Sequence, residues 1–355
     1  MFTKDIPIEK LLSHDANYIP IDVRSPGEFH EATIPGAINI PLFTNEERAI
    51  VGTTYKQKGQ KEAKWLGMEI VSPKLPSMLK EIKNLIEAGK VPLLFCWRGG
   101  MRSMSMATFA GFSGLRVFRL TGGYRAFRQY IVEHLNEHLL PKQTFVLHGM
   151  TGVGKTLILN QLKKEGEPVL DLEGFAGHRG SVFGSIGIEE KNQKSFDGEL
   201  FDTLWSFKEK QIPYMFVEAE SRRIGRILLP DFIMEAKDKG FHLLITASLD
   251  MRVERIYEDY IGPNEQEPWF FNQVQQAFQH IAKRMETGSR TDCYRYLMEK
   301  KYRHFIRTLL VSYYDPRYAN KENEYEGQFI EINAEDIKMA AKTIKEMASP
   351  PIVKA

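Results

Sequence analysis

A glycine-rich segment in the middle of the chain constrains the fold more than any other feature. It reads Gly149-Met-Thr-Gly-Val-Gly-Lys155-Thr156 and matches G-x-x-x-x-G-K-S/T, between a strand pattern at residues 144–148 and a helical pattern at residues 157–164. On such a turn, successive backbone N–H groups converge on one phosphate, and the lysine reaches the next. The segment therefore predicts a phosphate-binding loop in an α/β domain. The expected ligand is a diphosphate, of which ATP is only the commonest example, and the expected contacts are Gly149, Gly152, Gly154, Lys155 and Thr156, with the Thr156 hydroxyl also a ligand for Mg²⁺.

Two α/β series follow one another along the chain. Before the loop, strand patterns at residues 18–23 and 91–95 alternate with helical patterns, the last of which spans residues 126–139 and stops at Pro141. After the loop, strand patterns recur up to residue 246, and residues 269–311 are helical. We expect two domains, residues 1–139 and 140–348, and a frayed tail from residue 349 onward.

Composition and charge limit the class of protein. The 355 residues suit about two domains, and 43% hydrophobic with 26% charged residues excludes a disordered or fibrous chain. The net charge of +2 argues against a protein that coats nucleic acid, and two cysteines are too few for a disulfide framework. Charges among the first ten residues and the lack of an apolar run of about 18 residues favour a cytoplasmic protein with no membrane segment.

A second candidate loop opens with a cysteine. Cys96 follows the strand pattern at residues 91–95 and begins the segment Cys96-Trp-Arg-Gly-Gly-Met-Arg-Ser103, which runs into a helix of small residues. Two glycines let backbone N–H groups converge on an anion at the start of that helix, and the arginines add positive charge, so a thiolate is stabilised. We predict a nucleophilic Cys96 in an anion pocket formed by Arg98, Gly99, Gly100 and Arg102. The competing interpretation is a buried cysteine at a strand end, which is how we interpret Cys293.

Two further segments after strand patterns carry candidate contacts. Segments 171–181 and 218–225 are rich in glycine and charge, at the strand ends where α/β folds place ligands. Asp171 and Glu218 are the candidates for the acidic group that completes a nucleotide site. His178, Arg179, Arg222 and Arg223 are candidate substrate contacts, although a salt-bridged helix start would explain the second segment equally well.

Each of two basic segments has two interpretations. Residues 247–255, with Arg252 and Arg255, are typical of small phosphate-loop kinases, in which arginines cover the transferred phosphate, or of a basic pair on a solvated helix. Residues 283–307 interleave cations with Tyr294, Tyr296, Tyr302 and Phe305. Such a segment suits RNA, whose phosphates and splayed bases it can bind, or an amphipathic helix with its tyrosines in a core.

The first domain resembles the rhodanese family. The resemblance rests on Ile21-Asp-Val-Arg24, Glu28-Phe29, the segment Ile34-Pro-Gly-Ala-Ile-Asn-Ile-Pro41 and the cysteine loop. It implies a loop cysteine that carries a persulfide sulfur. The spacing Cys96-x5-Arg102 departs from the commoner Cys-x-x-Gly-x-Arg-Ser and is that of cysteine phosphatases, some of which share the fold. A sulfurtransferase or cysteine phosphatase fused to an ATP-dependent small-molecule kinase is therefore an alternative, as is a non-catalytic tRNA-binding scaffold.

The order of the two domains resembles that of the tRNA 2-selenouridine synthase family over nearly the whole chain. The resemblance implies an α/β chain with a rhodanese-like domain, then a P-loop NTPase-like parallel-sheet domain with a helical C-terminal part. It implies that wobble 2-thiouridine (position 34) of tRNAs for lysine, glutamate and glutamine is S-geranylated from geranyl diphosphate and then converted to 2-selenouridine with selenophosphate. In that chemistry the phosphate loop would bind the diphosphate, with Mg²⁺ as a helper and no tightly bound cofactor. Cys96 would accept selenium as a selenenyl sulfide, by analogy with the persulfide.

Overall fold

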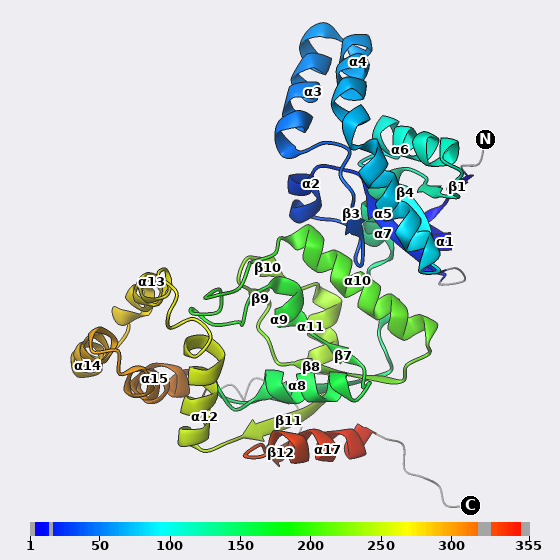
Figure 1. The fold of residues 1–355 in the computed structure, drawn as a ribbon. Coiled ribbons are helices and arrows are strands. Elements are labelled where there is room, and N and C mark those ends of the chain that lie inside the picture. The colour runs from blue at the N-terminus through cyan, green and yellow to red at the C-terminus, as the bar shows by residue number, and fades with distance from the viewer. Residues whose placement is uncertain (1–3, 14–16, 319–327, 349–355) are drawn as a thin grey trace, which may run out of the picture. The chain divides into compact units, whose positions relative to one another are not determined.

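The structure is a computed structural model that describes residues 4–13, 17–318 and 328–348. The chain divides near Leu135 into two compact α/β units, with Asp197–Asp202 grouped with the first, and each unit is described by itself (Figure 1). The tail expected from residue 349 lies outside the described residues. None of the helices in the described ranges combines the length and the apolar character needed to cross a bilayer.

The first unit is built on a five-stranded parallel sheet in the order β1-β5-β4-β2-β3. Its strands are β1 (Lys4–Ile6), β2 (Tyr18–Asp22), β3 (Ile38–Asn39), β4 (Val91–Phe95) and β5 (Phe118–Leu120). Its helices are α1 (Ile8–Leu12), α2 (Pro26–Glu31), α3 (Asn45–Lys58), α4 (Gln60–Val71), a short 3-10 turn (Ser72–Lys74), α5 (Leu75–Glu87), α6 (Met101–Phe112) and α7 (Gly123–His134). Strand β4 has neighbours on both sides and four buried residues in succession, as its apolar sequence requires. The central strand thus carries Cys96 to the carboxyl edge of the sheet.

The helix expected over residues 126–139 is wrong at both ends. Helix α7 begins at Gly123, because Gly122 and Gly123 take positive φ angles of 72° and 61° and turn the chain directly into the helix. It ends at His134, and a separate 3-10 turn (Glu137–Leu139) follows, capped by the Asn136 side chain, which accepts a hydrogen bond from the His138 N–H. Asn136, a residue type that favours helix N-caps, was the sequence signal that a separate helical turn begins here.

The second unit also contains a five-stranded parallel sheet, in the order β12-β11-β6-β8-β7. Its strands are β6 (Gln143–His148), β7 (Val169–Leu170), β8 (Tyr214–Glu218), β11 (Phe241–Thr246) and β12 (Phe329–Asn333), with a separate antiparallel pair β9 (Arg223–Ile224) and β10 (Ile227–Leu228). Its helices are α8 (Lys155–Lys164), α9 (Leu172–Ala176), α10 (Gln193–Glu209), α11 (Asp231–Asp238), α12 (Leu249–Ile256), α13 (Phe270–Ala282), α14 (Thr287–Met298), α15 (Tyr302–Leu309), α16 (Asp315–Tyr318) and α17 (Ile337–Ala348), with π-helical turns η3 (Tyr257–Ile261) and η4 (Leu310–Tyr314). These observations confirm the expected fold class of two parallel-sheet units and a helical C-terminal part.

Helices α13, α14 and α15 form a small helical layer beside α12 (Figure 1). Their apolar faces meet in one core, in which Tyr302 and Phe305 are each only 3% exposed. These two rings belong to the core and are not available to stack on RNA bases. Cys293 is completely buried in the same core, and burial raises the pKa of its thiol to about 12, as the structural interpretation of this residue requires.

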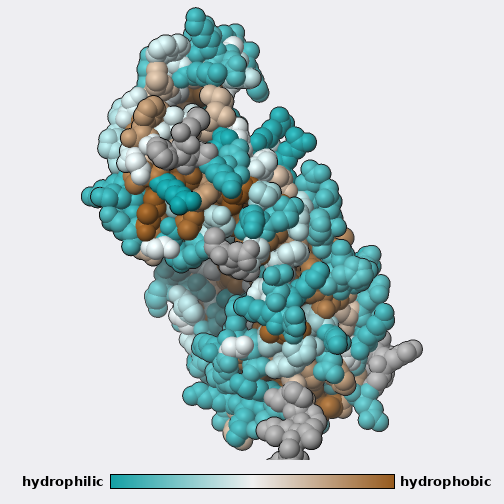
Figure 2. All heavy atoms as spheres, turned by 90° about the vertical axis from the view of Figure 1, so that its right-hand side faces the viewer, coloured by the Kyte–Doolittle hydropathy of each residue, from teal (hydrophilic) through white to brown (hydrophobic). Residues whose placement is uncertain are grey.

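Charged side chains cover much of the remaining surface of this layer. Arg295, Lys301, Arg303 and Arg307 each form an ion pair with a nearby carboxylate, so a large part of the basic segment is neutralised locally. The face of the molecule drawn in Figure 2 is likewise mainly hydrophilic, with hydrophobic side chains in small groups.

We predict that Gly123→Ala destabilises the first unit by about 2 kcal/mol or more. An alanine Cβ at this position would lie 2.1 Å from the Cys96 carbonyl oxygen and 2.5 Å from the Gly99 nitrogen, on a backbone that already has positive φ. Urea unfolding measures the effect. The matched control is Gly111→Ala in α6, where a Cβ meets nothing within 4 Å, and a gain of about 0.5 kcal/mol is expected. Equal midpoints for the two variants would contradict the close packing of the loop on α7.

Candidate functional site

The cysteine loop connects β4 to α6, and the beginning of α7 holds it through two backbone hydrogen bonds. The N–H groups of Tyr124 and Arg125 donate to the carbonyl oxygens of Cys96 and Trp97, both at 2.9 Å. Since these carbonyls face α7, the loop can turn its own N–H groups toward an anion at the start of α6. Gly99, with φ of +66°, makes the turn possible.

Cys96 and the two arginines of the loop differ in their exposure and in their bonding partners. Cys96 is 4% exposed, and its Sγ lies 3.4 Å from the Ser103 hydroxyl. Arg98 is exposed, and Gly99 and Gly100 lie beside it in the loop, as expected. Arg102 instead forms a two-pronged ion pair with Glu28, at 2.5 and 3.1 Å, so an anion in this loop must share the guanidinium with that carboxylate.

Glu28 is a residue that the sequence motifs did not reveal as part of this site. Burial alone would raise the pKa of its carboxyl, but the hydrogen bond and charge of Arg102 outweigh burial and lower it. Glu28 belongs to the rhodanese-like pattern and to the capping box of α2, in which the Ser25 N–H donates to Glu28, but neither signal placed it beside Arg102. The carboxylate therefore remains ionised and fixes the orientation of Arg102.

The phosphate loop joins β6 to α8, and two arginine side chains of α12 donate hydrogen bonds to its carbonyl groups. Arg252 donates from Nε to the Thr151 carbonyl at 2.9 Å, and Arg255 donates from Nη1 to the Val153 carbonyl at 2.7 Å. Both arginines are largely buried, at 4% and 8% exposure. The interpretation of this pair as basic residues on a solvated helix is therefore wrong, whereas the interpretation as cations near a transferred phosphate stays a prediction. They position the loop.

The predicted phosphate contacts of this loop lie together. Gly149, Gly152 and Gly154 all have positive φ angles, and a Cβ on Gly149 would lie 2.4 Å from the Ile245 carbonyl oxygen. The Lys155 ammonium is folded back over the loop and donates to the Gly149 carbonyl at 3.0 Å. A bound diphosphate would compete for this ammonium, as expected for the lysine of such a loop.

Three carboxylates converge beside the phosphate loop. Oxygen atoms of Glu173, Glu218 and Glu220 lie within 4.8 Å of one another, and the Thr156 hydroxyl donates to Glu173 at 3.3 Å. For Glu173 and Glu218, burial is the largest cause that raises the pKa, to about 9 and about 7, and repulsion from neighbouring carboxylates adds to the shift while Lys155 opposes it. Sequence analysis identified only Glu218 of the three.

This donor set fits Mg²⁺. The ion prefers oxygen ligands and is commonly bound by one or two carboxylates together with substrate phosphates. The Thr156 hydroxyl and the carboxylates of Glu173 and Glu218 offer such ligands next to the phosphate loop, and a cation would relieve their repulsion. By contrast, Asp171 caps α9 by accepting from the Gly174 N–H at 2.9 Å, so its expected place in the acidic site is taken by Glu173.

A cleft of about 950 Å³ contains the phosphate loop and the three carboxylates. Arg179 and Arg222 also line it, so both share this cleft with Lys155, Thr156 and Glu218, and their role as substrate contacts stays a prediction. Arg179 is held by Asp259 at 3.1 Å and lies over the Tyr260 ring, and Arg222 pairs with Asp231.

Two predicted contacts do not line this cleft. His178 accepts a hydrogen bond from the Gly180 N–H on its Nδ1 atom at 3.1 Å, which shapes the loop after α9. Arg223 lies on β9 with its side chain exposed. Among the described residues that line the cleft, neither His178 nor Arg223 is found.

The fold and the two loops define a protein with a rhodanese-like unit followed by a P-loop unit. The family model described as Rhodanese-like domain matches residues 8–130, and the model described as tRNA 2-selenouridine synthase AAA domain matches residues 142–348. The chain therefore belongs to the tRNA 2-selenouridine synthase family, which confirms the resemblance seen in its motifs.

Curated relatives named tRNA 2-selenouridine synthase agree with this assignment. The relative from Nitrosomonas europaea is 35% identical over 68% of this chain and 63% of its own length. The match thus spans less than two thirds of that relative. The relatives from Hydrogenovibrio crunogenus and Pseudomonas syringae are 34% and 33% identical, over 84% and 92% of this chain and 87% and 94% of theirs.

The carboxylates predict a distinct dependence of stability on pH. Because the pKa values of Glu173 and Glu218 are raised above 4.5 in the folded state, the folded protein holds protons that the unfolded chain has lost. Without divalent cations, the free energy of unfolding should therefore fall as pH rises from about 4.5 to 9, by at most about 1.4 kcal/mol per pH unit and proton. Denaturant unfolding at several pH values measures this slope. Glu173→Gln should flatten it, whereas exposed Glu267→Gln should not, and parallel profiles for all three proteins would exclude the raised pKa.

Proposed function

We propose that the protein is a transferase that converts wobble 2-thiouridine (position 34) of tRNA to 2-selenouridine through an S-geranyl intermediate. The observation that carries the proposal is one chain in which a cysteine loop built for a tetrahedral anion precedes a phosphate loop with three nearby carboxylates, in a family whose relatives bear this name. The expected substrates are tRNAs for lysine, glutamate and glutamine, geranyl diphosphate and selenophosphate.

The P-loop unit is suited to the geranyl transfer. The uridine sulfur attacks C1 of the geranyl group, the C1–O bond breaks, and diphosphate leaves with the bonding electrons. Lys155 and the N–H groups of residues 152–155 would stabilise the charge that develops on this leaving group. Thr156, Glu173 and Glu218 would hold Mg²⁺, which when bound would neutralise part of the same charge. The step consumes no ATP.

The cysteine loop is suited to the selenium step. We propose that the Cys96 sulfur attacks phosphorus of selenophosphate, so that an S–P bond forms, the Se–P bond breaks and selenium leaves with the electron pair as hydroselenide. Hydroselenide adds to C2 of the S-geranylated uridine and geranylthiol leaves, after which water releases phosphate from Cys96. A selenenyl sulfide on Cys96 would instead require phosphorus to depart with the bonding electrons as phosphite. The spacing of Cys96 and Arg102, shared with cysteine phosphatases, favours attack at phosphorus.

The kinase alternative rested in part on the pair Arg252 and Arg255. Both guanidinium groups donate to carbonyls of the phosphate loop, and Arg252 also pairs with Asp315 at 2.6 Å. Arg255 nevertheless lines the cleft that contains the loop. The kinase alternative therefore stays a second hypothesis.

The first test of the proposal is nucleoside analysis by mass spectrometry after incubation with 2-thiouridine-containing tRNA, geranyl diphosphate and selenophosphate. We expect Cys96→Ala to abolish selenation and leave some geranylation, because the loop acts only in the second step. Lys155→Ala should lower both by about 100-fold or more, since it removes the cation at the leaving group. The control is Cys293→Ala, which changes a cysteine buried in the helical core. The absence of geranylated and selenated products with the unaltered protein would refute the proposal, and normal selenation by Cys96→Ala would refute the role of the loop.

The second test concerns tRNA binding. Lys283 and Arg284 are exposed beside the end of α13, and no ion pair engages them among the described residues. We expect reversal of both charges to glutamate to weaken tRNA binding and to lower its salt dependence by about one unit of slope for each lost phosphate contact. Filter binding at several salt concentrations measures both quantities. Lys338→Glu with Lys342→Glu on α17 is the matched control, and equal losses in the two double variants would show only a general effect of charge.

A further inference from the structure

Helices α3 and α4 lie side by side and project from the sheet of the first unit (Figure 1). Gly59, with φ of +95°, joins them into a hairpin. Helix α3 has no buried residue, and the buried residues of α4 recur every fourth position, at Ala63, Gly67 and Val71, so only one face of α4 is packed. A helix of 14 residues is about 20 Å long, so the end of the hairpin reaches well beyond the sheet.

The tip of this hairpin, residues 55–65, concentrates positive charge. It holds four lysines against one glutamate, so its net charge is +3. The lysines are Lys56, Lys58, Lys61 and Lys64. All four are exposed, and no ion pair engages them among the described residues. Cations at the base of the hairpin are neutralised instead, since Arg48 pairs with Glu28 and Lys74 with Glu47. The tip therefore offers cations that no carboxylate of the described chain occupies.

An exposed aromatic ring lies at each end of the tip. Tyr55 is 57% exposed and Trp65 is 58% exposed, although large aromatic rings are usually well buried. Neither ring belongs to the core of this unit. Lys61 precedes Trp65 by one helical turn and so lies on the same face of α4. In contrast to the buried rings of Tyr302 and Phe305, these two rings are open to a ligand.

We propose that the hairpin tip is a tRNA-binding surface, on which the lysines bind backbone phosphates and Trp65 stacks on an unpaired base. The inference rests on the proposed function for the identity of the RNA. Cations beside exposed rings match the two recognisable parts of single-stranded RNA, its charged phosphates and its flat base faces. A protein partner would fit the tip less well, because lysine is depleted at protein interfaces.

Binding of a tRNA transcript to the full-length protein at several salt concentrations tests the lysines. Lys61→Glu with Lys64→Glu should weaken binding at low salt by about tenfold or more, and should reduce the salt dependence by about one unit of slope for each lost phosphate contact. The matched control is Lys80→Glu with Lys83→Glu, which makes the same change of charge at exposed positions of α5 in the same unit. Equal losses in the two double variants would overturn the proposal.

A comparison of two RNAs tests the aromatic ring. Trp65→Ala should weaken binding of tRNA by about fivefold or more and leave a fully paired RNA duplex unaffected, because only an unpaired base can stack on the ring. Trp65→Phe should restore most of the loss. Phe112→Ala removes a ring that is 87% exposed at the end of α6, away from the lysines in sequence, and should change neither affinity. Unchanged tRNA binding by Trp65→Ala, or equal losses for both RNAs, would overturn the stacking role.

The failure of this inference is distinguishable from the failure of the proposed function. If the tip variants weaken tRNA binding but the unaltered protein forms no geranylated or selenated nucleoside, the tip is sustained and the proposed function is refuted. If the tip variants bind tRNA normally but change the oligomeric state in sedimentation experiments, the tip is an interface between copies of the chain. That result would overturn the inference and leave the proposed function intact.

Discussion

Both anion-binding loops depend on the same constraint: carbonyl groups of each loop accept hydrogen bonds from residues outside the loop. A strand-to-helix turn can present N–H groups to an anion only if its carbonyls point elsewhere and find partners there. In the first unit the partners are the N–H groups that begin α7, at Tyr124 and Arg125. In the second unit they are the guanidinium groups of Arg252 and Arg255. The geometry of both loops thus depends on hydrogen bonds from residues that lie outside the loops.

The two kinds of donor that hold these loops, backbone N–H groups and guanidinium groups, differ in the charge that they bring to the loop. Backbone N–H groups hold the cysteine loop without adding a net charge, and the strongest cation beside that loop, Arg102, is matched by ionised Glu28. The phosphate loop has two buried arginines behind it and three carboxylates before it. Burial and repulsion raise the pKa values of Glu173 and Glu218, so a cation that bound beside them would displace protons from these two groups.

The sequence predicted those parts of the site that lie within one continuous segment. The phosphate loop and the cysteine loop were found because their glycines, cations and flanking patterns follow one another directly along the chain. Glu173 and Glu220 escaped because they meet only when β7 and β8 pair, and neither belongs to a motif. Tyr302 and Phe305 show that even a continuous segment can be ambiguous. Alternation of cations and aromatic residues is equally typical of an RNA-binding surface and of a helix with one buried face. Burial decides between the two, and burial is a property of the whole layer.

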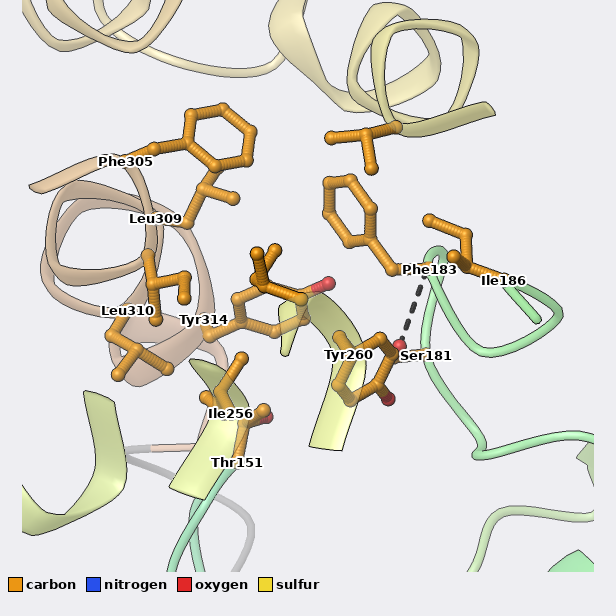
Figure 3. Close-up of a pocket in the computed structure, with 13 residues that line it drawn as sticks. Thr151, Ser181, Phe183, Ile186, Ile256, Tyr260, Phe305, Leu309, Leu310 and Tyr314 are labelled. Atoms are coloured by element: carbon orange, nitrogen blue, oxygen red, sulfur yellow. Dashed lines mark hydrogen bonds between the residues drawn. The ribbon is translucent and has the colours of Figure 1, made fainter. Parts of the chain in front are cut away.

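A small apolar pocket of about 60 Å³ beside the phosphate cleft (Figure 3) could not have been predicted from any single pattern. Its wall combines Thr151 of the phosphate loop with the loop after α9 and with helices near the end of the chain, which are far apart in the sequence. Thr151, Ser181 and Tyr260 line both the pocket and the phosphate cleft, so the two spaces are continuous only in the folded unit. The placement of the phosphate loop in both walls depends on the hydrogen bonds that Arg252 and Arg255 donate to its carbonyl groups.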